Sequence, residues 1–510
     1  MELADKSRSC RMSKSVGEVI EGRASGRYAV IDVGSNSIRL VVFKALNRSL
    51  NVIFNEKISC GLGSDLPITG RLSTKGVEQA LKNLARFAHL IEAMDVALVD
   101  AVATAAVRDA SDGSSFVEQV KREVGMHLRV LTGPEEAKYT ALGVISSVRS
   151  AAGLIADLGG GSLELAEVAG DVVGRTTTLP FGSLRFAGNE KVVTKDQLAD
   201  LTAKMGKLDW LSGHKGQDIF LVGGAWRSLA RLHMFQNKYP LQVVHKYSLG
   251  YKEAVNFTGL LSVQSYASLA PISQISTRRL KLLPLSAQIL SIVLEQIRPS
   301  RIVFVAGGLR EGLAFSRLPI EEQNRDPLIT VCMDIAGRAA RFPGHGKELA
   351  DWLAPLFPRE TEEEGRLRYA ACLLCDIAWS VHPGYRPEYA LMESALMQAP
   401  MDHFGRAFIG LATMTRYSRR RVPKFAEQIQ SLVDKDSLGR ARAIGLAARV
   451  GETLSGGVPG ALGAFSLDIN EKEVILSYSE KGSALVGHMV RERFTALAKH
   501  LNLKPLYTLE

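Results

Sequence analysis

The sequence is poor in aromatic side chains and has no long apolar run. Phe, Trp and Tyr make up 7% of the 510 residues. No ladder of aromatic residues suited to stacking on bases is present, so we expect no nucleic-acid partner. No apolar stretch reaches the roughly 18 residues that a membrane-spanning helix needs. The first 26 residues contain no apolar signal core, which predicts a flexible N-terminal tail and no membrane anchoring.

Cysteine is also scarce. Five cysteines, an odd number, form no disulfide framework. Cys372 and Cys375 have the spacing of a metal or redox pair, but no second pair completes a zinc site. Both lie in the apolar run YAACLLCDIAW, and we interpret them as buried core thiols. We therefore expect a cytoplasmic protein.

Basic residues exceed acidic ones. Lys and Arg number 63 against 53 Asp and Glu, a formal net charge of +10, which favours an anionic partner such as nucleic acid, polyphosphate or a phosphorylated nucleotide. The densest basic run, at residues 416–425, predicts either a solvated helix end or a track that guides an anion. Its basic side chains are Arg416, Arg419, Arg420, Arg421 and Lys424.

One motif is present twice, at residues 31–43 and 155–168. Each copy is an apolar strand ending in Asp, a turn of small residues and a second strand of alternating polarity. Superimposed, the copies place Asp32 on Asp157 and Ser37 on Ser162. The two copies, about 125 residues apart, predict a duplicated fold whose halves face each other across a phosphate-sized cleft.

The turns of both copies are suited to binding an anion. Ser35, Asn36 and Ser37 offer hydroxyl and amide donors in the first turn. The glycines of the second turn, at residues 159–161, let backbone N–H groups approach an anion closely.

Local signals predict several helices. Apolar spacing predicts one at residues 74–92 and another near residues 195–205. Thr132 and Glu135 fit a capping box with Pro134 in the first turn. Neighbouring helical positions point about 100° apart, so Glu135 caps the helix while Glu136 projects elsewhere. Two strand–Gly–Gly–helix junctions, at residues 223–224 and 307–308, favour either a ligand at the helix N-terminus or tight helix–strand packing.

In this order the elements resemble the actin, sugar-kinase and chaperone ATPase superfamily. Four motifs, DVGSNSIRL, ATAAVRDA, LTGPEEA and DLGGGSLEL, closely resemble the exopolyphosphatase/guanosine pentaphosphate phosphohydrolase family. The resemblance implies a duplicated actin-like (ribonuclease H-like) α/β core, with phosphatase domains at residues 27–149 and 150–325. A flexible tail at residues 1–26 precedes this core, and an all-helical HD-like domain at residues 326–510 follows it.

The resemblance also implies the chemistry. Glu136 would be the base that activates water, and Asp157, Glu164 and Asp32 would hold or orient Mg²⁺. The remaining motif residues would cradle phosphates: Ser35, Asn36, Ser37, Arg39, Arg108, Gly159, Gly160, Gly161 and Ser162. Such parts suit phosphoryl transfer, which depends on positioning and on neutralising charge.

The HD-like domain departs from its pattern. His345 lies where the first metal-binding histidine is expected, and His382 follows in SVHPGY. Cys375 replaces the histidine expected before Asp376. We therefore predict packing, dimerisation or substrate guidance for this domain, and no second metal-dependent site.

The function expected from the sequence is hydrolysis of the terminal phosphoanhydride of inorganic polyphosphate, by a protein expected to form a homodimer. The alternative within the same class is a guanosine pentaphosphate 5′-phosphohydrolase. An acceptor kinase and a non-enzymatic phosphate sensor are the alternatives from other classes.

Overall fold

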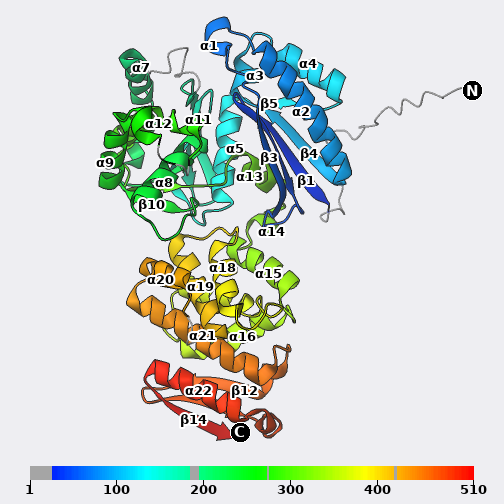
Figure 1. Ribbon diagram of the computed structural model, residues 1–510, viewed down its shortest axis with the longest axis vertical. Helices are drawn as coiled ribbons and strands as arrows, with labels where there is room; N and C mark the ends of the chain where they lie inside the picture. The colour runs from blue at the N-terminus through cyan, green and yellow to red at the C-terminus, as the bar shows by residue number, and fades with distance from the viewer. Residues whose placement is uncertain (1–25, 184–193, 271, 273–274, 419–421, 510) are drawn as a thin grey trace, which may run out of the picture. The chain divides into compact units, whose positions relative to one another are not determined.

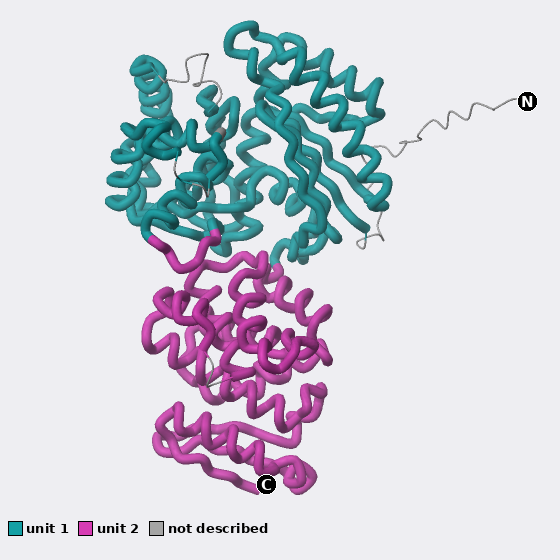
Figure 2. The backbone as a smooth tube through the Cα atoms, in the orientation of Figure 1, with its two compact units in different colours: residues 1–237, 244–324 teal, residues 238–243, 325–510 magenta. Residues whose placement is uncertain are grey.

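The computed structural model describes residues 26–183, 194–270, 272, 275–418 and 422–509. The chain divides into two compact units (Figure 2). Unit 1 comprises Met1–Asn237 and Val244–Asn324, and unit 2 comprises Lys238–Val243 and Arg325–Glu510. Within the described ranges, no helix combines the length and the hydropathy that crossing a bilayer requires.

The first half of unit 1 is built on a five-stranded sheet in the order β3-β2-β1-β4-β5 (Figure 1). Its strands are β1 (Arg27–Val33), β2 (Ser37–Phe43), β3 (Val52–Ser59), β4 (Val96–Ala103) and β5 (Arg129–Val130). Helices α2 (Thr74–Ala93) and α4 (Gly113–Val124) bury Leu84, Phe87 and Phe116 in a core with Ile31 and Leu40 of the sheet. The helix predicted at residues 74–92 is therefore confirmed. The short helices of this half are α1 (Leu66–Thr69) and α3 (Ala105–Asp109).

The second half of unit 1 repeats this topology. Its six-stranded sheet has the order β10-β11-β9-β6-β7-β8. The strands are β6 (Ala152–Leu158), β7 (Leu163–Ala169), β8 (Val172–Leu179), β9 (Asp218–Val222), β10 (Tyr247–Gly250) and β11 (Arg301–Phe304). In both sheets three antiparallel strands lie in the spatial order third, second, first, and the fourth strand pairs parallel with the first. The next parallel strand is β5 in the first sheet and β11 in the second, where β10 adds an antiparallel edge strand. The predicted duplication is thus confirmed.

The two hairpins match residue by residue. Asp32 pairs with Arg39 in the β1–β2 register, and Asp157 pairs with Glu164 at the equivalent place in β6–β7. The same backbone hydrogen bond closes both turns, from Gly34 N to Ser37 O at 3.1 Å and from Gly159 N to Ser162 O at 3.0 Å.

Helices of the second half complete unit 1. They are α7 (Lys195–Gly206), α8 (Gly224–Gln236), α9 (Tyr251–Ser262), α10 (Tyr266–Leu269), α11 (Thr277–Leu280), α12 (Leu283–Ile297), α13 (Leu309–Ser316) and α14 (Ile320–Gln323). Helix α7 confirms the helix predicted near residues 195–205. Helices α8 and α13 begin directly after the two Gly–Gly junctions, as the sequence predicted.

Helix α5 (Gly133–Ile145) packs on α13 with almost no side chain between them. A Cβ atom at Gly143 would lie 2.1 Å from the carbonyl oxygen of Gly308, and one at Gly312 would lie 1.7 Å from that of Tyr139. Both distances are far below van der Waals contact, so only glycine allows this approach. On its other side, Leu309 and Leu313 of α13 join a core with Tyr28 and Val41 of the first sheet.

Unit 2 is mainly helical, but it is not all-helical as predicted. Its helices are α15 (Pro327–Ala339), α16 (His345–Leu353), α17 (Glu362–Leu373), α18 (Arg386–Leu396), α19 (His403–Tyr417), α20 (Lys424–Ile429), α21 (Lys435–Ser455) and α22 (His488–Leu501). It also contains a sheet that the sequence analysis did not predict, in the order β12-β13-β14. Its strands are β12 (Phe465–Ile469), β13 (Glu473–Tyr478) and β14 (Lys504–Leu509).

Candidate active site

A cavity of about 440 Å³ lies in unit 1 and is lined by the turns of both hairpins. Eleven of the predicted site residues line it: Asp32, Ser35, Asn36, Ser37, Arg39, Glu136, Asp157, Gly159, Gly160, Gly161 and Ser162. Arg108 and Glu164 lie outside its lining: Arg108 is bound to Glu136, and Glu164 is buried. The fold therefore brings together most of the residues that the motifs singled out.

The two turns approach each other closely at Gly161. A Cβ atom there would lie 2.8 Å from the hydroxyl of Ser35 and 2.9 Å from the Cβ of Ala105. The glycine-rich second turn thus lets the backbone of one half meet the first turn of the other. Residues of both turns consequently line one cavity.

Glu136 reaches the cavity from the first turn of α5. The side chain of Thr132 accepts a hydrogen bond from Glu135 N, and the Glu135 carboxylate accepts one from Thr132 N at 2.8 Å. This confirms the predicted capping box and leaves Glu136, one position later, directed into the site. Burial raises the pKa of Glu136 to about 7, although the guanidinium of Arg108 lowers it. A carboxylate with such a pKa can accept a proton near neutral pH.

Arg108 is bound to Glu136. Its Nη1 donates to Glu136 Oε2 at 2.8 Å and to the carbonyl oxygen of Leu131 at 3.2 Å, while its Nε donates to Asp109 Oδ1 at 3.2 Å. The side chains of Arg108 and Glu136 are 20% and 13% exposed. Arg108 therefore holds the carboxylate of Glu136 from behind the cavity.

Two further carboxylates lie beside Glu136. Asp157 lines the cavity, and its Oδ2 accepts a hydrogen bond from Thr140 at 3.2 Å. Glu164 is buried behind it and accepts a hydrogen bond from Thr178 at 3.0 Å. Burial raises the pKa of both groups, and the charges of Glu136 and Asp157 raise that of Glu164 further. Three carboxyl groups are thus gathered at this corner of the cavity.

Asp32, predicted to face a metal ion, is held by an arginine. Arg310 Nη1 donates to Asp32 Oδ2 at 2.7 Å, and the two side chains are 13% and 18% exposed. Arg310 lies in the first turn of α13, directly after the second Gly–Gly junction. The carboxylate of Asp32 is therefore neutralised by a guanidinium group.

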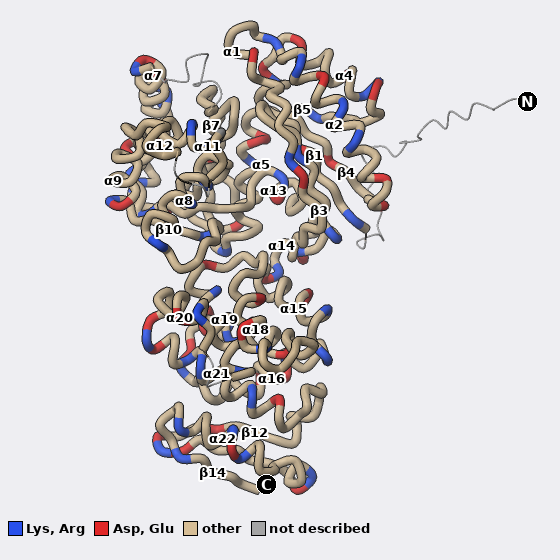
Figure 3. Tube along the Cα trace, viewed as in Figure 1, with Lys and Arg blue, Asp and Glu red and all other residues tan. Residues whose placement is uncertain are grey.

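Five basic side chains among the described residues line the cavity: Arg39, Lys57, Arg227, Arg279 and Arg310. Burial and the charges of their neighbours lower the pKa of Arg39 and of Arg227 to about 10, and that of Lys57 to about 8. Cations that depress one another in this way are the counterpart of a ligand with several negative charges. Figure 3 shows acidic and basic residues interspersed along the chain, so the fold, and not a basic run, assembles this set.

Sequence reasoning missed four of these cations. Arg227 and Arg310 lie in the first turns of the helices that follow the Gly–Gly junctions, where a ligand had been considered, so their position was an available signal. Lys57 pairs with Arg39 across β2 and β3, a register that no motif reveals. Arg279, in the short helix α11, has no signal in the sequence.

The predicted polyphosphate track differs from the structure at Arg416. This side chain is 13% exposed, and its Nη2 donates to Glu452 Oε2 at 3.1 Å, so it points into unit 2 and away from solvent. Burial beside Glu452 and Asp376 outweighs exposure to water because both carboxylates need a counter-charge. Arg419, Arg420 and Arg421 lie outside the described residues, and Lys424 is exposed at the start of α20.

The duplicated sheets define an actin-like core of two halves, with the cavity at their hairpin turns. The Ppx/GppA phosphatase family matches residues 41–321, more than half of the chain, and the family "Exopolyphosphatase, C-terminal" matches residues 328–505. The chain belongs to the Ppx/GppA phosphatase family. It is accordingly a hydrolase of phosphoanhydride bonds.

The chain is also similar to a curated protein and to solved structures. Retrograde regulation protein 2 of Saccharomyces cerevisiae is 27% identical over 455 residues, which cover 79% of this chain and 75% of the yeast protein. The Ppx/GppA family member of Aquifex aeolicus is 28% identical, with a TM-score of 0.49, over 59% of this chain and 99% of its own. An exopolyphosphatase from Cytophaga hutchinsonii shares the fold at 19% identity and a TM-score of 0.51, over 57% of this chain and 97% of its own.

Proposed function

We propose that the chain is an exopolyphosphatase, which hydrolyses the terminal phosphoanhydride of inorganic polyphosphate and releases orthophosphate. The observation that carries this proposal is the cavity in which both hairpin turns, Glu136 and five basic side chains converge. Phosphoryl transfer needs donors around the transferred group, neutralisation of its charge and an oriented nucleophile. The residues that line the cavity are suited to these tasks.

Different residues of the chain have different roles in this hydrolysis. The turn donors, from Ser35 to Ser37 and from Gly159 to Ser162, hold the oxygens of the terminal phosphate. Glu136 accepts a proton from water as its oxygen attacks the terminal phosphorus, and the bond to the bridging oxygen breaks. Arg108 keeps the carboxylate of Glu136 in place and partly ionised at neutral pH.

The donor chemistry of the cavity fits Mg²⁺ at Asp157. Its carboxylate lines the cavity and makes no ion pair in the described part of the chain. It lies beside Glu136 and Glu164, and carboxylates gathered in this way favour the binding of a cation. Asp157 would hold the ion, with Glu164 behind it. When bound, Mg²⁺ would neutralise charge on the phosphate oxygens. Asp32 is assigned to Arg310 instead.

Polyphosphate is favoured over guanosine pentaphosphate by the character of the lining. None of the described residues that line the cavity has an aromatic ring on which a guanine could stack. The basic side chains, by contrast, match a linear polymer with one charge on each phosphate. Guanosine pentaphosphate is therefore the alternative substrate.

The test is parallel turnover of long polyphosphate, short polyphosphate and guanosine pentaphosphate, without any phosphate acceptor. We expect orthophosphate release with the highest kcat/KM on polyphosphate, and its loss in Glu136→Gln. A higher kcat/KM on guanosine pentaphosphate would assign the alternative. No release from any of them without an acceptor would indicate a kinase or a sensor. The mass in solution tests the expected homodimer.

A further inference from the structure

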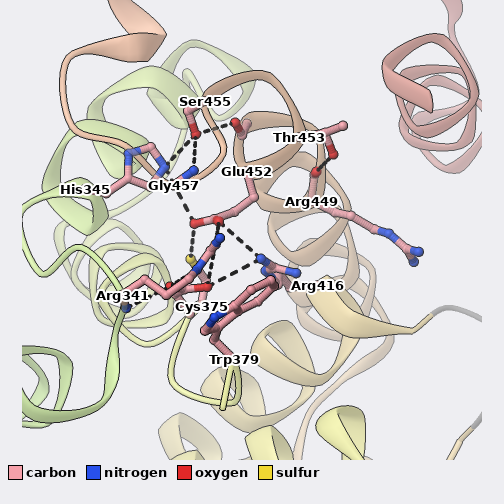
Figure 4. Close-up of polar contacts among 12 residues, drawn as sticks. Arg341, His345, Cys375, Trp379, Arg416, Arg449, Glu452, Thr453, Ser455 and Gly457 are labelled. Atoms are coloured by element: carbon pink, nitrogen blue, oxygen red, sulfur yellow. Dashed lines mark hydrogen bonds and ion pairs between the residues drawn. The ribbon is translucent and has the colours of Figure 1, made fainter. Parts of the chain in front are cut away.

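Unit 2 contains a buried cluster of charged and polar groups where several helical segments meet (Figure 4). Its members are Arg341, His345, Cys375, Asp376, Arg416 and Glu452. They come from the segment after α15, the start of α16, the segment after α17, and helices α19 and α21. The side chains of Asp376 and Glu452 are only 10% and 2% exposed. Two carboxylates are thus removed from water and need partners within the fold.

The groups that could bind a metal do converge here. Glu452 Oε1 lies 3.6 Å from His345 Nε2 and 3.5 Å from Cys375 Sγ. Asp376 joins Glu452 through an arginine that contacts both. The HD-like resemblance implies a metal ion at His345 and at the position before Asp376. The residues of the cluster therefore allow a direct test of whether such an ion fits.

Guanidinium groups engage both oxygen atoms of Asp376 and one oxygen atom of Glu452. Arg341 Nε and Nη2 each donate to Asp376 at 2.9 Å, and Nη2 also donates to Glu452 Oε2 at 2.9 Å. Arg416 Nη2 donates to the same Glu452 oxygen at 3.1 Å. Two fixed positive charges thus balance two negative ones, and a divalent cation would be repelled by both arginines.

His345 is engaged as well. Its Nδ1 lies 3.2 Å from Glu348 Oε2, and its Nε2 lies 3.1 Å from the hydroxyl of Ser455. The Glu348 carboxylate in turn accepts hydrogen bonds from Gly460 N and Leu462 N at 2.8 and 3.0 Å. Both ring nitrogens therefore have partners that belong to the fold of unit 2.

The flat face of the Arg341 guanidinium group also has a partner, the ring of Trp379. Its Cζ lies 4.0 Å from the centroid of the Trp379 ring, and Arg386 contacts the same ring at 4.6 Å. A planar guanidinium can make a two-pronged contact with a carboxylate along its edge while its face stacks on an aromatic ring. The surroundings of Arg341 are thus built for this side chain.

We propose that Arg341 and Arg416 take the place of a metal ion in unit 2, which is a metal-independent domain without a hydrolytic centre of its own. The guanidinium groups join α19 and α21 to the segments that follow α15 and α17, as an ion bound by the same carboxylates would. Cys375 is in keeping with this arrangement. Its thiol donates to Glu452 and brings no positive charge, so the arginines remain the counter-charges of that carboxylate. This inference does not depend on the substrate bound in unit 1.

The test uses the full chain and two readouts, the metal content of the purified protein and its melting temperature with EDTA, Mn²⁺ or Zn²⁺. The double variant Arg341→Met/Arg416→Met frees the carboxylates of the cluster. Arg366→Met is the matched control, because Arg366 forms ion pairs with Asp326 and Glu363 in the same unit but outside the cluster. Shifts are compared with wild type at equal metal concentration, so that binding in unit 1 cancels.

We expect wild type and Asp376→Asn to have the same metal content. EDTA should shift the melting temperatures of the two proteins by the same amount. The double variant should melt lower and regain roughly 5 °C with excess Mn²⁺ or Zn²⁺, whereas Arg366→Met should melt lower without regaining it. A metal present in wild type and lost in Asp376→Asn would overturn the proposal, and this readout holds even if the double variant does not fold. A folded double variant that metal fails to stabilise would also overturn it.

Discussion

Removing Arg108 should move the pH dependence of hydrolysis to higher pH. Arg108 donates to Glu136 at 2.8 Å, both side chains are mostly buried, and the guanidinium lowers the pKa of a carboxyl that burial has raised to about 7. A hydrogen bond to a charged group contributes about 1.5–3 kcal/mol, and 1.36 kcal/mol corresponds to one pKa unit. Arg108→Gln should therefore raise the pKa of Glu136 by about 1–2 units.

The sign follows from the role of the base. Glu136 accepts a proton only when it is ionised, so activity rises as pH increases through its pKa. For wild type the acidic limb of kcat against pH should have its midpoint near pH 7, and for Arg108→Gln it should lie at about pH 8–9. Arg122→Gln, at an exposed position 70% accessible in the same half of unit 1, is the control and should leave the limb in place.

The assay is orthophosphate release at saturating polyphosphate from pH 5.5 to 9.5. Saturation separates the pH midpoint from any loss of affinity. An acidic limb that stays in place or moves to lower pH in Arg108→Gln would refute the reasoning, because the ion pair would then have no hold on the ionisation of Glu136.

Three other outcomes follow from the site. Glu136→Gln should lower kcat by about 10²–10⁴-fold with little change in polyphosphate binding. Glu135→Gln should cost only about 1 kcal/mol of stability, because it weakens the helix cap. Kinetics and thermal unfolding of both variants check this, and exchanged phenotypes would contradict it. Burial and neighbouring cations lower the pKa of Lys57 to about 8, so the side chain loses its charge above that pH. KM for polyphosphate should therefore rise above pH 8 in wild type and stay level in Lys57→Arg. A rise of equal size in both proteins would speak against a role of Lys57 in binding polyphosphate. Asp157→Asn should raise the Mg²⁺ concentration for half-maximal activity by at least about tenfold. The control in this titration is Asp171→Asn, on an exposed turn. If both variants needed the same Mg²⁺ concentration, Asp157 would not belong to the metal site.

Local signals predicted the parts of the site that belong to single motifs. The capping box at Thr132 placed Glu136 correctly because it depends on residues three positions apart. The matched hairpins predicted the duplication because each is one continuous segment. The basic lining could not be predicted in the same way, since Arg39 and Arg310 lie 271 positions apart and meet only through the fold.

The errors in unit 2 have similar causes. Arg416 belongs to a basic run, yet the carboxylates that bury it come from Asp376 and Glu452, far away in the sequence. Strand β14 carries Pro505, which lacks a backbone N–H and weakens the sequence signal of a strand. Its partner β13 is central in its sheet, so β14 is an edge strand, where proline is tolerated.

The glycine contact between α5 and α13 has a consequence for motion in the active site. Helices that meet through backbone atoms have no layer of side chains that could slide or change rotamer. Glu136 on α5 and Arg310 on α13 therefore travel together as parts of one rigid block, and the distance between the base and the arginine bound to Asp32 is set by the backbone. The two helices thus form one wall of the cavity, since Glu136 and Arg310 both line it.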